Sequence, residues 1–183
     1  MAFVLLPFLA LLTRVSANEN GLAITPPMGW RSWNLFGSDV NQTLMTSIMD
    51  AMVDRKRGGV SLCDVGYCDV GLDDNWQLCD PDETLGSTYH DETGYPVVNK
   101  ALFPDMKAMV DHAHSLGLTA GFYGNNCICV DHDATYKKYY EGDVQAMMDF
   151  GFDGWKLDGC GGQTDMDLWD ELINATGKAI NVE

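Results

Sequence analysis

Four stretches of the chain carry apolar residues at the spacing of an amphipathic helix, and they cover residues 43–57, 105–116, 140–150 and 165–176. In the first stretch Leu44, Ile48 and Met52 fall on one face, because residues three and four apart share one side of a helix. A glycine follows each of the first three stretches, where it ends a helix at low conformational cost. The pattern therefore predicts four helices.

Short apolar segments bounded by turn residues alternate with these helices. The first ends the loop over residues 24–30, and the others cover residues 67–72, 119–123, 154–157 and 179–182. A β-α-β-α-β-α-β-α-β order predicts an α/β fold with a parallel sheet, because parallel strands need crossover connections. A doubly wound sheet and a (β/α)8 TIM barrel both fit. A dinucleotide-binding sheet fits less well, because no Gly-x-Gly-x-x-Gly motif follows the first strand.

The composition places the chain among globular proteins and narrows its partners. Of its 183 residues, 46% are apolar and 21% are charged, which is ordinary for a packed domain. The chain has 27 acidic and 11 basic side chains, for a net charge of −16. Because phosphate groups are bound by Lys and Arg patches, this charge argues against nucleic acid or an anionic membrane as a partner.

The N-terminus predicts secretion. The apolar run over residues 2–12 is too short to span a bilayer, and the small residues 15–17 that follow it are typical of a signal-peptide cleavage site. We expect cleavage after Ala17 and export or a lysosomal or vacuolar destination; the alternative is a buried N-terminal strand or helix. Sequons that begin at Asn41 and Asn174 are compatible with glycosylation in the secretory pathway.

The cysteines suggest disulfide bonds, because an even number of them in a secreted chain is typical of a disulfide framework. Cys127 and Cys129, near His132, also fit part of a metal site. Structural zinc sites use two ligand pairs, however, and no second pair follows. We therefore expect disulfides, no metal ion and no cofactor. The six cysteines are Cys63, Cys68, Cys79, Cys127, Cys129 and Cys160.

Polar and aromatic side chains collect where the predicted strands end. The carboxyl ends of parallel strands share one edge of a sheet, which is where α/β proteins build their active sites. The loop over residues 73–104 follows one of these ends, and loops of that length are usually functional. The side chains at the strand ends are Trp30, Asp73, Asp74, Tyr123, Lys156 and Asp158.

This set of residues suits a carbohydrate, because carboxylates bind sugar hydroxyls and aromatic rings pack against C–H faces. Glycoside hydrolysis uses two carboxyl groups, one of which can act as nucleophile. Asp158 is placed for that role, and Lys156, two residues earlier on the strand, points to the same side. Its ammonium group can pair with Asp158 or donate to a sugar hydroxyl.

The same residues also have structural interpretations. Lys156 and Asp158 could form an ion pair that only closes the strand end, and Asp73 and Asp74 could cap a helix or form a turn. Because side chains alternate along a strand, Asp73 and Asp74 cannot both point inward from a regular strand. We expect one to face the ligand and the other to bend in through the loop. Acidic, basic and aromatic groups at four strand ends together favour the sugar site.

Four motifs, in order from about Gly21 to the last residue, resemble those of glycoside hydrolase family 27, the α-galactosidase and α-N-acetylgalactosaminidase family. They lie at residues 25–34 (TPPMGWRSWN), 71–76 (GLDDNW), 103–105 with 117–123 (FPD and GLTAGFY), and 156–160 (KLDGC).

The resemblance implies a (β/α)8 barrel, a retaining mechanism and a terminal α-linked galactose on an oligosaccharide or glycoconjugate. It implies that Asp158 is the nucleophile, and that Cys160 pairs with Cys127 or Cys129. A homodimer of the full-length protein also fits. The residues expected to line the galactose site are Trp30, Asp73, Asp74, Tyr123 and Lys156.

The chain departs from the family pattern in two side chains and in length. Asn75 stands where many members carry a disulfide cysteine, and Arg31 replaces a more usual Asn. A complete barrel needs roughly 250 residues. We therefore expect residues 18–183 to be an N-terminal part with about five strands and four helices, inactive alone because the acid/base Asp lies beyond it. The alternatives are an α-N-acetylgalactosaminidase, a truncated sugar-binding relative without catalysis and a secreted disulfide-rich module.

Overall fold

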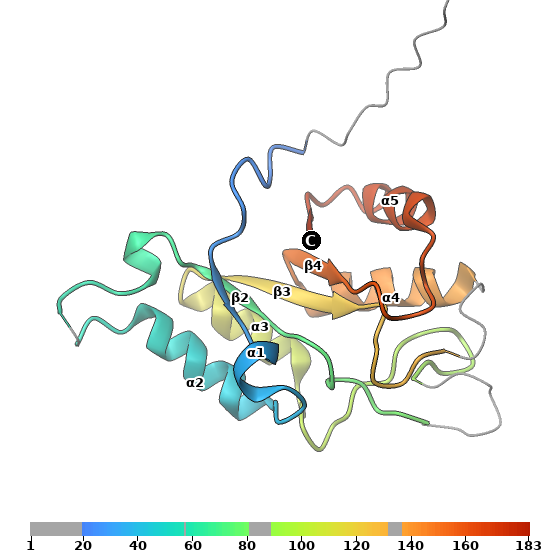
Figure 1. Cartoon of the computed structure of the whole chain (residues 1–183), viewed down its shortest axis with the longest axis horizontal. Helices are drawn as coiled ribbons and strands as arrows, with labels where there is room; N and C mark the ends of the chain where they lie inside the picture. Colours follow the sequence, from blue (N-terminus) through green and yellow to red (C-terminus); the bar gives the residue numbers. More distant parts are fainter. Residues whose placement is uncertain (1–19, 57, 81–88, 132–136) are drawn as a thin grey trace, which may run out of the picture.

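The computed structural model describes residues 20–56, 58–80, 89–131 and 137–183, so the predicted signal peptide lies outside the described residues. Five strands form one parallel sheet in the order β1-β2-β3-β4-β5, and each pairs with the next in sequence (Figure 1). The predicted order of strands is therefore confirmed. The strands are β1 (Gly29–Arg31), β2 (Asp69–Gly71), β3 (Thr119–Gly124), β4 (Gly154–Leu157) and β5 (Asn181–Val182).

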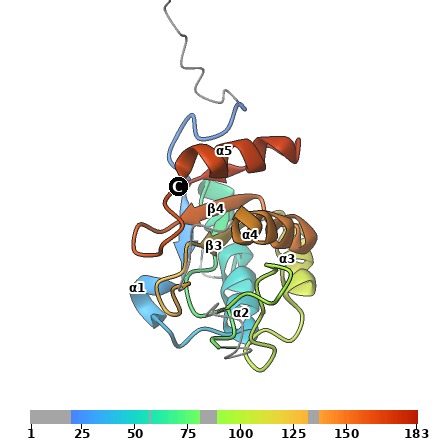
Figure 2. The ribbon, with the colours of Figure 1, turned by 90° about the vertical axis from the view of Figure 1, so that its right-hand side faces the viewer.

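Helices connect the strands, and neighbouring helices pack together: α2 against α3, α3 against α4 and α4 against α5. Figure 2 shows α3 and α4 side by side on the same side of the strands. The four predicted helices are present, and two short turns add to them, because one turn of helix has no periodic signal. The helices are α1 (Trp33–Phe36), α2 (Gln42–Val53), the 3-10 helix η1 (Cys63–Val65), α3 (Met106–Ser115), α4 (Lys137–Phe150) and α5 (Met166–Ala175).

Polar side chains fix where three of these helices begin. Asn41, Asp105 and Asp165 precede α2, α3 and α5, and each accepts a hydrogen bond from the backbone N–H three residues later, at 2.9, 2.9 and 3.0 Å. Such a cap contributes about 1 kcal/mol. Gly117 and Gly151 follow α3 and α4 with φ of +77° and +91°, a left-handed conformation that favours glycine.

The predicted end of the first long helix is wrong. The apolar pattern extends to residue 57, but α2 ends at Val53 and Asp54 is extended, with ψ of 124°. The Arg55 guanidinium instead makes two hydrogen bonds to the Asp64 carboxylate, at 2.7 and 2.6 Å. This pairing draws the chain toward η1. On α2 the predicted Met52 is buried, but Leu44 and Ile48 are only half-buried. The residues next to them, Met45 and Met49, are buried instead.

The hydrophobic core lies between the sheet and the helices. Phe122 of β3 is fully buried, and its ring lies 4.7 Å from the rings of Trp76 and Phe152. Methionines at positions 45, 49 and 52 bring α2 onto this core, and they are each 1% exposed. Burying such a side chain contributes about 1.5–3 kcal/mol. The packed core holds the strands in the register that determines the site.

Glycines form one row across the opposite face of the sheet. Arg31 of β1 is aligned with Gly71 of β2, which is aligned with Gly121 of β3 and then Gly154 of β4. A Cβ atom at Gly71 would lie 2.7 Å from the Arg31 Cζ, and one at Gly121 would lie 3.3 Å from its Nη2. The glycines therefore leave the space in which the Arg31 side chain lies across the sheet.

Candidate functional site

The strand register brings four chemically active side chains into one row beyond the glycines. Tyr123 and Lys156 are direct partners in β3 and β4. Asp73 lies two residues after Gly71 of β2, and Glu183 lies two residues after Asn181 of β5, which is aligned with Gly154. Because side chains alternate along a strand, both point to the same face as Tyr123 and Lys156. This row, which we call the carboxyl-edge row, consists of Asp73, Tyr123, Lys156 and Glu183. Asp158 lies at its border, one residue after β4.

The Asp158 carboxylate is held by neighbours and still reaches solvent. Its Oδ2 accepts a hydrogen bond from the Tyr123 hydroxyl at 2.9 Å, and its Oδ1 accepts one from the Cys160 N–H at 3.3 Å. The Lys156 Nζ lies 3.7 Å from the same Oδ2. The side chain is 30% exposed. It is therefore oriented at an accessible edge, as a nucleophile requires.

Lys156 links two carboxylates of the site. Its Nζ donates to the Asp73 Oδ2 at 2.8 Å and lies 3.7 Å from the Asp158 Oδ2. The same atom lies 5.1 Å above the centre of the Tyr123 ring. A cation between two acidic groups reduces their mutual repulsion. Lys156 therefore allows Asp73 and Asp158 to lie close together.

Asp73 is buried at this edge, although its strand end faces the site. Its Oδ2 accepts from Lys156 and lies 4.0 Å from the Arg31 Nε, and its Oδ1 accepts from the Asp74 N–H at 3.0 Å. Arg31 also donates to the Leu72 carbonyl at 2.9 Å and contacts the Glu183 carboxylate. Burial lowers the pKa of Arg31, and the charge of Asp73 opposes that shift.

The Asp74 carboxylate is turned toward the main chain after β3. Its Oδ1 accepts from the Asn75 N–H and the Gln77 side-chain amide, both at 2.7 Å. Its Oδ2 accepts from the N–H groups of Cys127 and Ile128, both at 2.9 Å. With four donors and 1% exposure, this carboxylate holds the β3–α4 connection in place. A direct sugar contact by Asp74 stays a prediction.

Tyr123 is a buried hydrogen-bond donor. Its hydroxyl lies 2.9 Å from the Asp158 Oδ2 and 3.1 Å from the Cys127 Sγ. Burial and the nearby carboxylates of Asp74 and Asp158 raise the pKa of this hydroxyl far above its usual range. The phenol therefore keeps its proton and donates it to Asp158 as a hydrogen bond.

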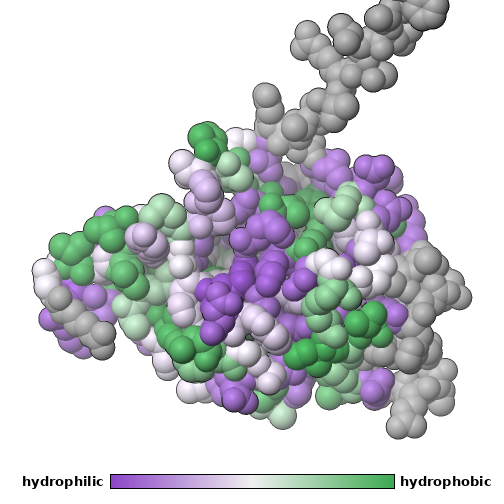
Figure 3. Space-filling model, in the orientation of Figure 1, coloured by the Kyte–Doolittle hydropathy of each residue, from purple (hydrophilic) through white to green (hydrophobic). Residues whose placement is uncertain are grey.

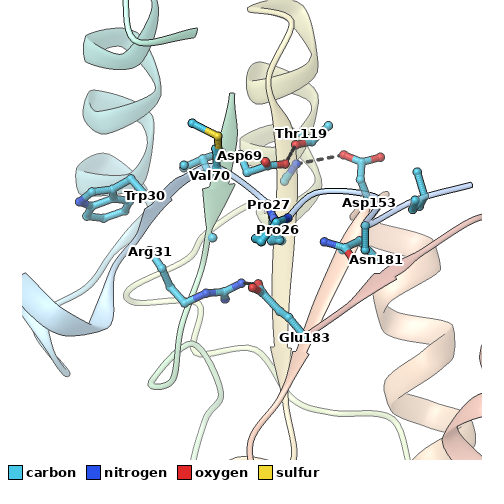
Figure 4. A pocket seen from close by; sticks show the side chains of 18 of the residues that line it. Pro26, Pro27, Trp30, Arg31, Asp69, Val70, Thr119, Asp153, Asn181 and Glu183 are labelled. Carbon is cyan, nitrogen blue, oxygen red and sulfur yellow. Dashed lines mark hydrogen bonds and ion pairs between the residues drawn. The ribbon is translucent and has the colours of Figure 1, made fainter. Parts of the chain in front are cut away.

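Trp30 does not join the carboxyl-edge row. It is aligned with the core residues Val70 and Ala120, and it packs against the core. Side chains alternate along β1, so placing Arg31 on the site face turns Trp30 to the other face. Figure 4 shows the two side chains pointing apart. The exposed aromatic ring near this edge is Trp33 of α1, which is 42% exposed.

Disulfide bonds hold the segments beside Asp158. The structure pairs Cys127 with Cys160, across a Cα–Cα distance of 5.4 Å, and Cys129 with Cys79. The third bridge joins Cys63 and Cys68 near η1. The sequence left Cys127 and Cys129 open as partners of Cys160. Because all six cysteines are bridged, the Cys127-x-Cys129 pair offers no free thiolates to a metal ion.

The face drawn in Figure 3 is polar in its middle and apolar at one end. In Figure 3 hydrophilic residues gather in the middle of the face, between α1 and the end of the chain. Apolar residues cover the end over the α2–β2 connection, where Val60, Leu62 and Val65 are more than half exposed, at 57%, 54% and 57%. No helix within the described ranges combines the length and apolarity that a bilayer-spanning segment requires.

A cavity of about 580 Å³ lies on the same face of the sheet, toward the amino ends of the strands. Arg31 and Glu183 reach toward each other across it, and Asp69 and Thr119 form a hydrogen bond at its margin (Figure 4). Asp158 and Lys156 do not line it. Arg31 and Glu183 were not predicted as site residues. Arg31 lies in the row two residues before Asp73 and Lys156, and Glu183 is level with Lys156, so the register of the parallel strands is the signal that would have found both residues.

The predicted glycosylation sites are accessible. Asn41 and Asn174 are both exposed, at the start of α2 and near the end of α5. The Asn41 side-chain oxygen caps α2, while its amide nitrogen is the atom that a glycan would modify. Glycosylation at these positions stays a prediction.

Comparison with known proteins connects this geometry to a family. The profile of the family described as Alpha galactosidase A matches residues 25–182. The chain is 37% identical over 145 residues to "Alpha-galactosidase" of Cyamopsis tetragonoloba, covering 78% of this chain and 32% of that protein. It is 32% identical over 187 residues to "Probable alpha-galactosidase" of Dictyostelium discoideum, covering 98% and 44%. The chain thus spans less than half the length of either relative.

A solved structure gives the same result for the fold. The structure of α-galactosidase from Saccharomyces cerevisiae with raffinose superposes with a TM-score of 0.71 at 26% identity, covering 89% of this chain and 35% of that one. Relatives of this kind are (β/α)8 barrels, and the five parallel strands with their helices correspond to the N-terminal part of such a barrel. The chain belongs to the Alpha galactosidase A family, glycoside hydrolase family 27.

Proposed function

We propose that the protein containing this chain is a retaining α-galactosidase that removes terminal α-D-galactose from oligosaccharides or glycoconjugates. The observation that carries the proposal is the Asp158 carboxylate, which is 30% exposed and oriented by Tyr123 beside Lys156. The family match and the α-galactosidases among its relatives support the substrate class.

In this proposal Asp158 attacks the anomeric carbon and forms a covalent glycosyl-enzyme, which water then hydrolyses. The attacking oxygen must have a free lone pair in the direction of the sugar. The Tyr123 hydroxyl takes one lone pair of Oδ2 at 2.9 Å, and the Cys160 N–H makes a longer contact of 3.3 Å to Oδ1. Oδ1 is therefore the less engaged oxygen, and we assign the attack to it.

Lys156 and Asp73 supply hydroxyl recognition in the proposal. The ammonium group has three hydrogens, and its contacts with Asp73 at 2.8 Å and Asp158 at 3.7 Å leave room for a sugar oxygen. A hydroxyl that accepts from Lys156 can donate to a carboxylate at the same time. Trp33, exposed at the same edge, is a suitable surface for a sugar C–H face, in the role that the sequence assigned to Trp30.

The mechanism also needs a second carboxyl group, about 5–5.5 Å from the nucleophile, to protonate the leaving oxygen. Asp73 and Asp74 are unsuited to this step. Asp73 is engaged by Lys156 and Arg31, and Asp74 accepts four hydrogen bonds from nitrogen donors. We therefore assign proton donation to a residue of the whole protein outside this chain.

The test is hydrolysis of p-nitrophenyl α-D-galactopyranoside by the protein expressed from its complete reading frame. We expect turnover with retention of anomeric configuration, observed by NMR of the first-formed sugar. The N-acetylgalactosaminide analogue, assayed in parallel, tests the alternative activity. Binding of galactose without turnover of either substrate would replace the proposal with a non-catalytic sugar-binding protein, and absence of both would refute it.

We also propose that the protein enters the secretory pathway, with cleavage after Ala17. The three disulfide bonds support this proposal, because such bonds persist in oxidising compartments. N-terminal sequencing of the exported protein tests it. An intact Met1 on material that has left the cell would contradict it.

A further inference from the structure

A buried histidine lies between two carboxylates behind the site. His90 lies in the connection from β2 to α3 and has no exposed surface. Its Nδ1 is 3.0 Å from the Asp131 Oδ2, and its Nε2 is 3.0 Å from the Asp143 Oδ1. Where both carboxyl groups are ionised, each ring nitrogen needs a hydrogen, because a bare nitrogen lone pair would face a negative oxygen. Burial raises the pKa of Asp143, and the charge of His90 and its hydrogen bond oppose that rise. The geometry therefore fits an imidazolium.

The other groups around His90 agree with a positive charge. The ring of Tyr139, on α4, stacks on it at 4.5 Å, and the ring of Tyr89 lies 4.1 Å away. Burial by itself lowers the pKa of His90, but the charge of Asp143 and the hydrogen bonds to both carboxylates outweigh it and raise the pKa to about 9. Burial also raises the pKa of Tyr89, so this phenol stays neutral.

A series of hydrogen bonds connects this histidine to the strand end that carries Asp158. The Asp143 Oδ2 accepts from the side-chain amide of Gln163 at 2.8 Å. The Gln163 backbone N–H donates to the Asn125 Oδ1 at 2.7 Å. The Asn125 Nδ2 in turn donates to the backbone carbonyl of Asp158. We call His90, Asp131, Asp143, Gln163 and Asn125 the histidine network.

The main chain at the end of the network has little freedom to adopt another path. Asn125 has φ of +54°, which is uncommon for a residue with a side chain. A Cβ atom at Gly161 would lie 2.2 Å from the Asn125 Oδ1, so only glycine lets the loop after β4 close over this side chain. The Gln163 carbonyl accepts from the Trp169 indole at 3.0 Å. The loop that follows Asp158 therefore depends on Asn125 and Gln163.

We propose that the imidazolium of His90 is a positioning residue for Asp158, and that it acts through Asp143, Gln163 and Asn125, so that the geometry of the nucleophile depends on pH. The link to the Asp158 main chain stands on the hydrogen bonds alone. Its effect on turnover rests on the proposed function. The two parts can therefore be tested separately.

The sign of the pH effect follows from the raised pKa of His90. A group whose pKa is about 9 in the folded protein and 6.5 when unfolded stabilises the fold fully below the lower value. The contribution is lost as the pH rises through the folded value of about 9. Loss of the proton leaves one ring nitrogen without a hydrogen for its carboxylate, and the contact to Asp143 or Asp131 becomes repulsive.

The experiment compares three variants of the protein expressed from its complete reading frame. His90→Gln keeps a polar side chain of similar volume and removes the charge, and His90→Arg keeps a charge that does not titrate in this range. His112→Gln is the matched control, because His112 also contacts a carboxylate, the Asp50 Oδ1 at 2.9 Å, but on the exposed surface between α3 and α2. None of these residues touches the sugar in the proposed mechanism.

The first readout is hydrogen exchange of the Gln163 backbone N–H, the group that donates to Asn125. This measurement needs no enzymatic activity. At pH 7 we expect exchange to be at least tenfold faster in His90→Gln than in the wild type, and near the wild-type rate in His90→Arg and His112→Gln. In the wild type, after correction for intrinsic base catalysis, protection should fall near pH 9 together with the NMR titration of the His90 ring. Gln163 protection that is the same in His90→Gln and the control, or constant from pH 7 to 10, would overturn the proposal.

The second readout is turnover of the α-galactoside at pH 6. We expect His90→Gln to lower kcat tenfold or more with little change in KM, because the nucleophile moves while the hydroxyl contacts remain. His90→Arg should restore most of the loss. If the wild type has no activity, the proposed function fails while the exchange measurement still decides the positioning role. If His90→Gln does not fold, the wild-type titration and the exchange profile decide it.

Discussion

The two ends of β4 each carry an aspartate, and the two differ in what surrounds them. Asp153 immediately precedes the strand and Asp158 immediately follows it, with side chains 28% and 30% exposed. Asp153 accepts from the His114 Nε2 at 2.7 Å and the Ala120 N–H at 3.0 Å, and pairs with the Lys178 Nζ at 3.2 Å. These partners connect α3 and the segment after α5 to the sheet.

Asp158 has neighbours of another kind. Tyr123 and Lys156 are side chains of the sheet itself, and they point toward the accessible edge. The exposed fraction therefore does not separate Asp153, which joins elements of the fold, from Asp158, the proposed nucleophile; the origin and direction of their partners do. This agrees with the general division of labour in α/β barrels, where the amino ends of strands serve stability and the carboxyl ends serve catalysis.

Replacing Asp158 with Asn should give the largest effect on the comparison. In the whole protein we expect turnover of the α-galactoside to fall by at least about 10⁴-fold, because the amide cannot form the covalent intermediate. Galactose binding should remain largely intact, since Lys156 and Asp73 keep their positions. Isothermal titration with galactose and a steady-state assay measure the two quantities. Near-normal turnover would remove Asp158 from the nucleophile role.

Removing the Cys127–Cys160 bridge tests how far this bridge stabilises the fold beside Asp158, at the carboxyl end of β4. Replacing Cys127 and Cys160 together with Ser should lower the free energy of unfolding by about 2–4 kcal/mol, because the bridge restricts the unfolded chain. Denaturant unfolding of the wild type and the double variant measures this difference. The Cys63→Ser, Cys68→Ser pair, far from the site, is the control for loss of a bridge as such. A larger loss of kcat in this control than in the Cys127→Ser, Cys160→Ser variant would contradict the view that the Cys127–Cys160 bridge supports Asp158.

Replacing Asp153 with Asn tests the opposite end of the strand. We expect a loss of about 1–2 kcal/mol in stability, from weakened hydrogen bonds to charged groups, and unchanged kcat. Burial alone would raise the pKa of Asp153, but the hydrogen bonds from the Ala120 N–H and His114 and the charge of Lys178 outweigh it and lower this pKa below 3.8. The stabilisation is therefore present above 3.8 and lost as the pH falls through the lower folded value.

Melting curves of the wild type and Asp153→Asn from pH 2 to 7 check this prediction. The two proteins should differ at neutral pH and converge in acid. A constant difference across the range would mean that Asp153 does not stabilise the fold through its charge. A fall in kcat without a fall in stability would break the comparison between the strand ends.

The smallest effect should come from Lys178, the cation at the structural end. Its Nζ donates to the Gly151 carbonyl at 3.0 Å and pairs with Asp153 at 3.2 Å. Lys178→Gln should cost about 1 kcal/mol of stability and leave kcat unchanged, because the pair is partly exposed.

Lys156→Gln, at the carboxyl end of β4, should have the opposite result, with a larger effect on kcat/KM than on stability. Thermal melting and steady-state kinetics of both variants decide it.

Much of the fold could be predicted because it depends on local patterns. Alternating helical and strand segments gave the order of elements. The strand ends gave Asp158, Lys156, Tyr123 and Asp73 as candidates, which the structure brings together and whose roles stay predictions. The end of α2 could not be read from periodicity, because Arg55 pairs with Asp64, nine residues along the chain. Helical spacing describes what a segment favours by itself, not what a distant carboxylate does to it.

The parts of the site that escaped prediction depend on pairing between strands or on contacts between loops. Trp30 lies on the core face because its neighbour Arg31 occupies the site face. Only the register of the strands decides which of the two side chains points toward the site. His90 lies in a loop without periodicity and meets Asp131 and Asp143, which are 41 and 53 residues away. No spacing rule connects positions that far apart.

The histidine network has a consequence for how this protein can change. Barrel enzymes commonly diversify by altering one strand-to-helix loop while the scaffold stays fixed. Here Asn125 and Gln163 belong to successive connections and share a hydrogen bond, and His90 joins a third connection to them through Asp143. We expect loops transplanted one at a time from a relative to be poorly tolerated, and a new substrate preference to arise more readily when all three connections are exchanged as a set.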